Sequence, residues 1–149
     1  MVFRNLGARS RRILTGPRRG LDNAAISVGR REVMLITTDP VSVVPEIGME
    51  WSAWLSVHLI ASDYTTSGQK PEFAAFNFNF PKEMHEGDKG KYLRNVGKEC
   101  RKLGVSIVAG HTGSYPGGGF TVVGGGTMFG FARKETTSTR PWLDPVTRS

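Results

Sequence analysis

Cysteine is almost absent from the sequence. Cys100 is the only cysteine among 149 residues, so an internal disulfide bond is excluded and a reducing, cytoplasmic compartment is expected. No apolar run approaches the ~20 residues needed to span a bilayer, and the first residues lack the apolar core of a signal peptide. A hydrophobic content of 38% is typical of a soluble, single-domain protein that can bury a core without disulfide bonds or structural metal ions.

Several common functional motifs are also missing. The sequence has no internal repeat, no zinc-ligand spacing, no nucleophile elbow and no Walker-type phosphate loop. The glycine run at 117–119 lacks the Lys-Ser/Thr pair that would follow in such a loop, so it is a weak phosphate-binding signal. These absences exclude the functions that short motifs most readily reveal.

Positive charge is unevenly distributed. Lys and Arg number 20 against 13 acidic residues, a net charge of +7. Residues 1–19 form a basic arm, and eight arginines precede residue 32: Arg4, Arg9, Arg11, Arg12, Arg18, Arg19, Arg30 and Arg31. Such a segment could meet nucleic acid, but Phe3 is its only aromatic residue, so we favour a solvated arm. Residues 133–149 form a polar tail.

An apolar run from Val33 to Ile36 predicts a strand that ends at Pro40, because proline cannot donate to a sheet ladder. Asp39 would then lie at a strand end, where open sheets present polar groups to ligands. The alternative is that Thr37, Thr38 and Asp39 simply begin a turn, a position both residue types favour.

A second strand at 24–28 and a turn at Gly29-Arg30 complete a predicted hairpin. In antiparallel neighbours, Asp22 and Asp39 would lie almost opposite each other at the hairpin's open end. Two carboxylates with water are a plausible Mg²⁺ site, because this cation takes oxygen ligands. The hairpin therefore predicts one half of a metal site.

The rest of the chain predicts two helices and three strands. Apolar periodicity indicates helices over 47–62 and 88–103, the second burying Cys100. Phe76, Phe78 and Phe80 alternate with Asn77 and Asn79, which is typical of a half-buried strand, here over 73–81. A short buried strand is expected over 105–109, and a last one over 120–132, where the glycines at 124–126 indicate a bulge or close backbone approach.

Several of these segments, taken in order, resemble the N-terminal domain of the aminoimidazole ribonucleotide (AIR) synthetase superfamily. That superfamily includes the hydrogenase maturation dehydratase, thiamine monophosphate kinase and selenophosphate synthetase. The resemblance is nearest to archaeal-type AIR synthase-related proteins and to the hydrogenase maturation branch. It is carried by Gly20-Leu-Asp22-Asn23, by Thr37-Thr38-Asp39-Pro40, by Ser62-Asp63 with Ser67-Gly68 and Pro71, by Ala109-Gly110-His111-Thr112, and by the glycine-rich strand.

The resemblance implies an α+β fold over residues 20–132. In such a domain a mixed, mostly antiparallel sheet of a four-stranded type carries two main helices on one face, and the other face pairs in a homodimer. It further implies ATP and Mg²⁺ as cofactors and phosphoryl transfer that activates an oxygen of a small-molecule substrate. The metal-facing residues would be Asp22, Asp39 and Asp63, and the wider cofactor site would add Asn23, Thr38, His111 and Thr112.

Three positions depart from the pattern of the superfamily. Asn23 replaces the second acid of an acidic pair, Ser62 replaces an asparagine, and His111 replaces a final acid. Neutral side chains are poorer ligands for Mg²⁺ than carboxylates. The departures therefore predict a weakened or altered metal site.

The superfamily's C-terminal domain has no counterpart in this sequence, so any enzyme would be incomplete alone and a separately encoded or truncated C-terminal domain is an expected partner. Three hypotheses stay open. In the first, the chain is the ATP-binding part of an enzyme, and in the second it is a dimerisation module that keeps only the fold. In the third, which we disfavour, it is a nucleic-acid binder that acts through its basic arm.

Overall fold

The computed structural model describes residues 6–137. Of the predicted basic arm and polar tail, residues 1–5 and 138–149 lie outside the described residues. Among residues 6–137 no helix is both long and apolar enough to cross a membrane. Six strands and two α-helices are described, with short 3₁₀ turns at Pro45–Ile47 and Lys134–Thr136: β1 (Ile13–Thr15), β2 (Ala24–Ser27), β3 (Glu32–Val41), α1 (Gly48–Thr65), β4 (Phe73–Pro81), α2 (Glu86–Leu103), β5 (Ser106–Tyr115) and β6 (Gly124–Arg133).

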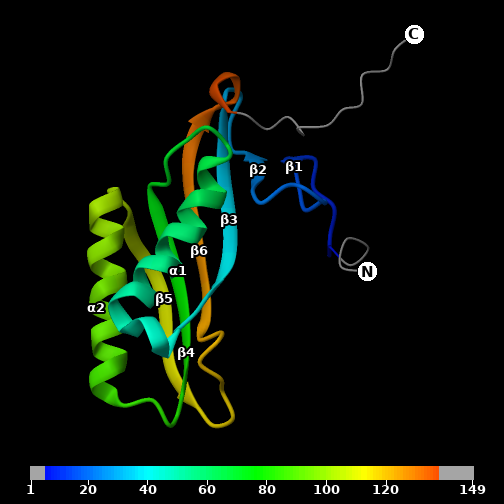
Figure 1. The fold of residues 1–149 in the computed structure, drawn as a ribbon. Helices are drawn as coiled ribbons and strands as arrows, with labels where there is room; N and C mark the ends of the chain where they lie inside the picture. The colour runs from blue at the N-terminus through cyan, green and yellow to red at the C-terminus, as the bar shows by residue number, and fades with distance from the viewer. Residues whose placement is uncertain (1–5, 138–149) are drawn as a thin grey trace.

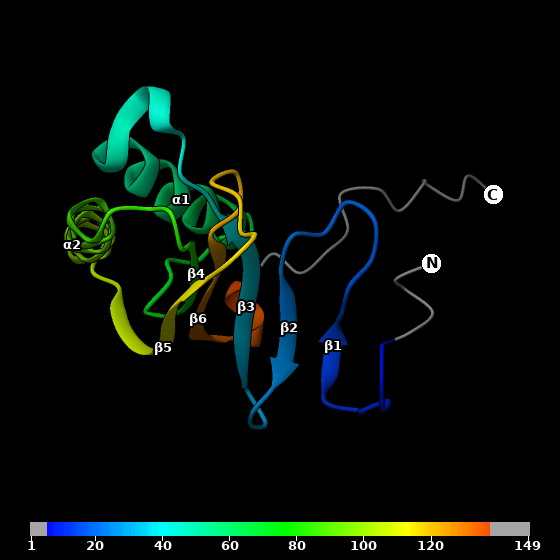
Figure 2. The ribbon, with the colours of Figure 1, turned by 90° about the horizontal axis from the view of Figure 1, so that it is seen from below.

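The strands form one sheet in the order β1-β2-β3-β6-β4-β5. β4 and β5 are parallel and joined through α2, whereas the other neighbours are antiparallel. Both helices lie on one face, over the β3-to-β5 part of the sheet, while β1 and β2 extend beyond them (Figures 1 and 2). The α+β class, the mostly antiparallel sheet and the one-sided helices are confirmed. The sheet has six strands, because β1, which the sequence pattern did not predict, adds to the five predicted strands and extends the four-stranded type that the resemblance implies.

The hydrophobic core lies between the sheet and the two helices. The predicted alternation in β4 is confirmed, since Phe76, Phe78 and Phe80 are buried while Asn77 is exposed on the other face. Tyr92 of α2 meets Phe78 and Phe80 edge-on, which fixes α2 over β4. Cys100 is buried in the same core, and burial raises the pKa of its thiol to about 11, so it is a packing residue.

The prediction that the strand ends at Pro40 is wrong. β3 continues to Val41, and Pro40 pairs with Gly125 of β6. The pairing of β2 with β3 ends at Ala24 and Ile36, so beyond that point β3 has a strand partner on one side only. Proline is tolerated where a strand has a free edge. Asp39 therefore lies within a strand and not at its end.

The predicted short buried strand at 105–109 is also wrong in extent and burial. β5 runs to Tyr115, and its residues are exposed or half-buried. It is an outermost strand with β4 as its only sheet neighbour, and α2 packs its apolar face on β4 instead. The apolar run of β5 therefore reflects strand propensity and not burial.

Candidate functional site

Asp39 faces the helical layer. Side chains alternate along β3, and Val33, Leu35, Thr37 and Val41 on the same side of the strand are all buried beneath the helices. The residue beside Asp39 in the sheet is Gly126. A Cβ atom there would clash with Ile60 Cδ1 of α1, so the absence of a side chain lets the helix approach the sheet next to Asp39.

The docking of α1 on β3 brings Asp63 to the same place. Ser52 Oγ and Ser56 Oγ bond the backbone of Val44 and Ser42, so the helix returns antiparallel to β3. Seven helical residues beyond Ser56 amount to about 10 Å, which matches roughly three strand residues back from Ser42. Asp63, in the last turn of α1, is therefore level with Asp39.

The charges of two other carboxylates act on Asp63 at this point. The pKa of Asp63 is raised from 3.8 to about 6, first by partial burial and then by the negative charges of Asp39 and Asp22. The aspartates come from the start of β2, from β3 and from the end of α1. Like charges at close range destabilise the ionised state, and a bound cation would relieve that repulsion.

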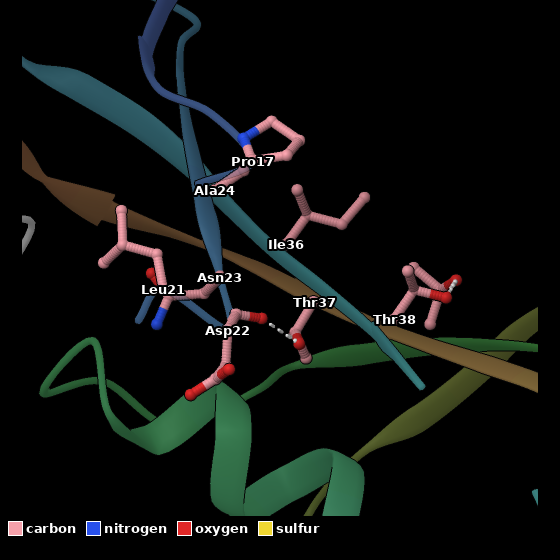
Figure 3. A pocket seen from close by; sticks show the side chains of 9 residues that line it. Pro17, Leu21, Asp22, Asn23, Ala24, Ile36, Thr37 and Thr38 are labelled. Atoms are coloured by element: carbon pink, nitrogen blue, oxygen red, sulfur yellow. Dashed lines mark hydrogen bonds between the residues drawn. The ribbon is translucent and has the colours of Figure 1, made fainter. Parts of the chain in front are cut away.

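Asn23 holds two of these segments together. Its Nδ2 donates to Thr66 Oγ1 at 2.7 Å and to the Asp63 carbonyl at 3.4 Å, and the residue is only 8% exposed. The adjacent Asp22 carbonyl accepts a hydrogen bond from Thr37 Oγ1. Figure 3 shows the Asp22 carboxylate directed toward α1. The Asn23 amide therefore positions Asp22 and Asp63 relative to each other.

A pocket of about 360 Å³ opens beside this cluster, where β2 begins and the edge of β3 is unpaired (Figure 3). Thr38, one of the predicted site residues, lines it and donates to the Gly126 carbonyl at 3.1 Å. The carboxylates of Asp39 and Asp63 lie outside its lining, on the helical side of β3. The lining residues are Pro17, Leu21, Asp22, Asn23, Ala24, Ile36, Thr37, Thr38 and Thr127.

The oxygen-rich donor set suits Mg²⁺, which uses one or two carboxylates together with water and substrate phosphates. Within residues 6–137 no group of three or more His, Cys, Asp or Glu side chains is placed so that it could hold a metal ion. A metal ion bound here would therefore need other ligands, such as water or substrate phosphates, for much of its coordination shell.

His111 and Thr112 do not join the three aspartates in this chain. They pair with Asn77 and Phe78 from the outermost strand β5. Two strands separate β5 from β3, which places them about 14 Å apart at the usual strand spacing. His111 is exposed, with Nε2 2.9 Å from Tyr115 Oη. Their role in binding a cofactor stays a prediction.

The sequence reasoning missed two contributors to this site. Thr66, which accepts the Asn23 amide, had no signal beyond its place in a polar break after the helix. Thr127 lines the pocket and donates to Thr38 Oγ1 at 3.2 Å, although nothing around it in sequence marks it. The glycines at 124–126, by contrast, did indicate the close approach of another backbone, which Gly124 permits, since a Cβ there would clash with the Asn77 carbonyl.

Comparisons with known proteins give consistent results. The sequence model of the AIR synthase related protein, N-terminal domain, matches residues 20–132. The thiamine-monophosphate kinase of Nitrosopumilus maritimus is 25% identical over 107 residues, covering 72% of this chain and 32% of that protein. The chain therefore spans about a third of the length of this curated relative.

Two solved structures share the fold at low sequence identity. AaThiL complexed with AMPPCP and TMP has a TM-score of 0.62 and 20% identity, covering 79% of this chain and 37% of that chain. T. maritima PurL complexed with ATP has a TM-score of 0.64 and 14% identity, covering 80% of this chain and 21% of that chain. At these identities the likeness concerns the fold.

Proposed function

The chain belongs to the family of AIR synthase related proteins, and from this premise we propose that its N-terminal-type domain binds ATP and Mg²⁺ for an ATP-dependent phosphoryl transfer. The observation that carries the proposal is the convergence of Asp22, Asp39 and Asp63 from three elements beside a pocket. Solved relatives with this fold contain ATP or AMPPCP, which supports a nucleotide as the ligand.

Each residue of the cluster has a distinct task in this proposal. Asp39 and Asp63 would hold Mg²⁺ on the helical side of β3, and the Asp22 carboxylate, which is directed toward α1, would join them there. When bound, the ion neutralises phosphate charge, which is most of what phosphoryl transfer requires. Asn23 keeps Asp22 and Asp63 aligned, and the Thr38 hydroxyl, whose hydrogen is donated to the Gly126 carbonyl, would accept a hydrogen bond from a donor in the pocket.

Titration calorimetry of Mg-ATP into the full chain tests the proposal. We expect saturable binding that Asp39→Asn abolishes or weakens at least tenfold, because hydrogen bonds and metal contacts to charged groups carry much of the affinity. Asp88→Asn is the matched control, since Asp88 is exposed in the first turn of α2, away from the cluster. Absence of binding, both alone and with a C-terminal domain supplied, would exclude the proposal.

The chemistry beyond nucleotide binding requires further chain. The curated relative is about three times as long as the matched region, so we propose that a C-terminal domain, either separately encoded or part of a longer chain, contributes the small-molecule site. The complex would activate a substrate oxygen by phosphoryl transfer. A cytoplasmic location stays a prediction, supported by the single, buried Cys100.

The uncovered sheet face suits pairing with a second copy. Met34, Ile36 and three phenylalanines share this face, and Phe131 is 50% exposed. The ring of Phe73 lies 5.5 Å from that of Phe129 and 6.5 Å from that of Phe131, so they form one apolar patch. We propose a homodimer through this face. Sedimentation should show a dimer that Phe131→Ser dissociates, whereas a monomeric parent would contradict it.

A second candidate function is a dimerisation module without turnover. The amide of Asn23 favours it, because a residue that stands in an acid's position has its donors engaged in structure. This candidate predicts a stable dimer that binds no Mg-ATP even with a C-terminal domain present. The calorimetry above therefore separates the two functions.

A further inference from the structure

A second pocket, of about 650 Å³, lies at the opposite end of β3 and is lined by Arg30, Arg31, Glu32 and Arg133. The first two arginines stand in the turn between β2 and β3, and the third ends β6, a hundred residues later in the chain. Sheet pairing joins them, because Glu32 is the cross-strand neighbour of Arg133. The cluster is therefore a product of the fold. It lies at the upper end of the sheet in Figure 1.

The backbone of this pocket is held in place. Lys134 Nζ donates to the carbonyls of Gly29 and Arg30, both at 3.0 Å, and the Lys134 amide donates to the Arg31 carbonyl at 2.9 Å. Arg12 Nε donates to the Ser27 carbonyl at 2.9 Å, which adds another guanidinium near the end of β2. Because the hydrogen bonds from Lys134 fix the backbone of the hairpin turn, its arginines extend from a defined position.

The positive charge of the pocket is poorly compensated. In the part of the chain that the structure describes, no carboxylate lies within ion-pair distance of Arg30, Arg31 or Arg133. Glu32 is the single acid among the lining residues. Clustered like charges repel one another, and an anion that enters would remove that repulsion.

We propose that this pocket binds a compact, multiply charged phosphate group. Arginine suits this ligand because its planar guanidinium donates two parallel hydrogen bonds to phosphate oxygens. None of the lining residues is aromatic, so the pocket offers no platform on which a base would stack, and it recognises charge instead. Glu32 is seven residues from Asp39, about 23 Å along an extended strand, so this site is separate from the aspartate cluster.

Titration of inorganic tripolyphosphate into the full chain, in low salt with EDTA, tests the proposal without any contribution from Mg²⁺. We expect saturable binding that weakens as salt is added. Arg30→Ala/Arg31→Ala should weaken it roughly tenfold, since charge-assisted hydrogen bonds to phosphate are lost. Glu32→Gln should instead tighten it, because the only negative charge in the lining is removed.

The control is Arg94→Ala/Arg101→Ala, which removes the same net charge from exposed positions on α2. It should bind tripolyphosphate as the parent does, and melting curves confirm that every variant is folded. Absence of saturable binding, or an equal loss in the control, would overturn the proposal. A single-stranded oligonucleotide that binds more tightly than tripolyphosphate, and loses affinity when residues 1–19 are removed, would overturn it in favour of nucleic acid.

Discussion

The two ends of β3 carry charge clusters of opposite sign that are built in different ways. The aspartates lie under α1, where partial burial and mutual repulsion raise the pKa of Asp63 to about 6. The arginines surround an exposed hairpin turn, and Lys134 clamps only their backbone. At the acidic end, the packing of α1 on the sheet partly excludes solvent and so strengthens the interaction between the charges. At the basic end, solvent screens that interaction. Substitutions at the acidic end should therefore lower the free energy of unfolding more.

Gly126→Ala is expected to have the largest effect. The new Cβ would clash with Ile60 Cδ1 and come within 2.7 Å of the Phe76 ring, so these buried side chains would have to shift. Overpacking of this kind costs about 1–3 kcal/mol. Urea unfolding measures the loss. Gly125→Ala is the matched control, because its Cβ would meet only the Asp39 carbonyl at 3.7 Å, and equal stability of the two variants would contradict the close packing.

Asn23→Ala is expected to have the second-largest effect, because it removes both hydrogen bonds that join the start of β2 to the end of α1. Loss of these part-buried bonds is expected to lower the free energy of unfolding by about 1–2 kcal/mol. Hydrogen exchange should also accelerate at the end of α1. Asn95→Ala is the control, since that amide bonds only Lys91 O along α2, and it should leave the exchange near Asp63 unchanged.

The pH dependence of stability should show the repulsion at Asp63. Because its pKa is 3.8 when unperturbed and about 6 when folded, the native state binds more protons between these values. Its contribution is most favourable below pH 3.8 and is lost as the pH rises toward 6. Asp63→Asn should therefore be the more stable protein at pH 7.5 and lose that advantage at low pH. An unchanged pH profile would contradict the coupling.

The smallest effect is expected at the basic end. Arg30→Ala/Arg31→Ala should change the free energy of unfolding by no more than about 0.5 kcal/mol, because exposed charges away from packing contribute little. A small gain in low salt is expected, since repulsion is reduced, and added salt should remove it. Melting curves at two ionic strengths measure both. A loss above 1 kcal/mol would show that these arginines support the fold, and the comparison between the two ends would fail.

Much of the fold could be predicted from local patterns. The hairpin of β2 and β3, the alternating strand β4 and both helices follow from periodicity that burial confirms. The wrong predictions concern which strands lie next to one another in the sheet. A proline predicts the end of a strand, but Pro40 lies at a free edge, which tolerates it. An apolar run predicts a buried strand, but the run in β5 does not indicate that this strand lies outermost.

Local patterns in the sequence predict both helices, five of the six strands, the family and the residues expected to meet Mg²⁺, because side-chain chemistry and periodicity are local. Which of those residues lie close together depends on the tertiary fold. The order β3-β6-β4-β5 places His111 far from Asp39, while α1 returns Asp63 to it and β6 brings Arg133 to the hairpin turn. Strand order and helix docking arise from packing between distant segments, and no single segment encodes them.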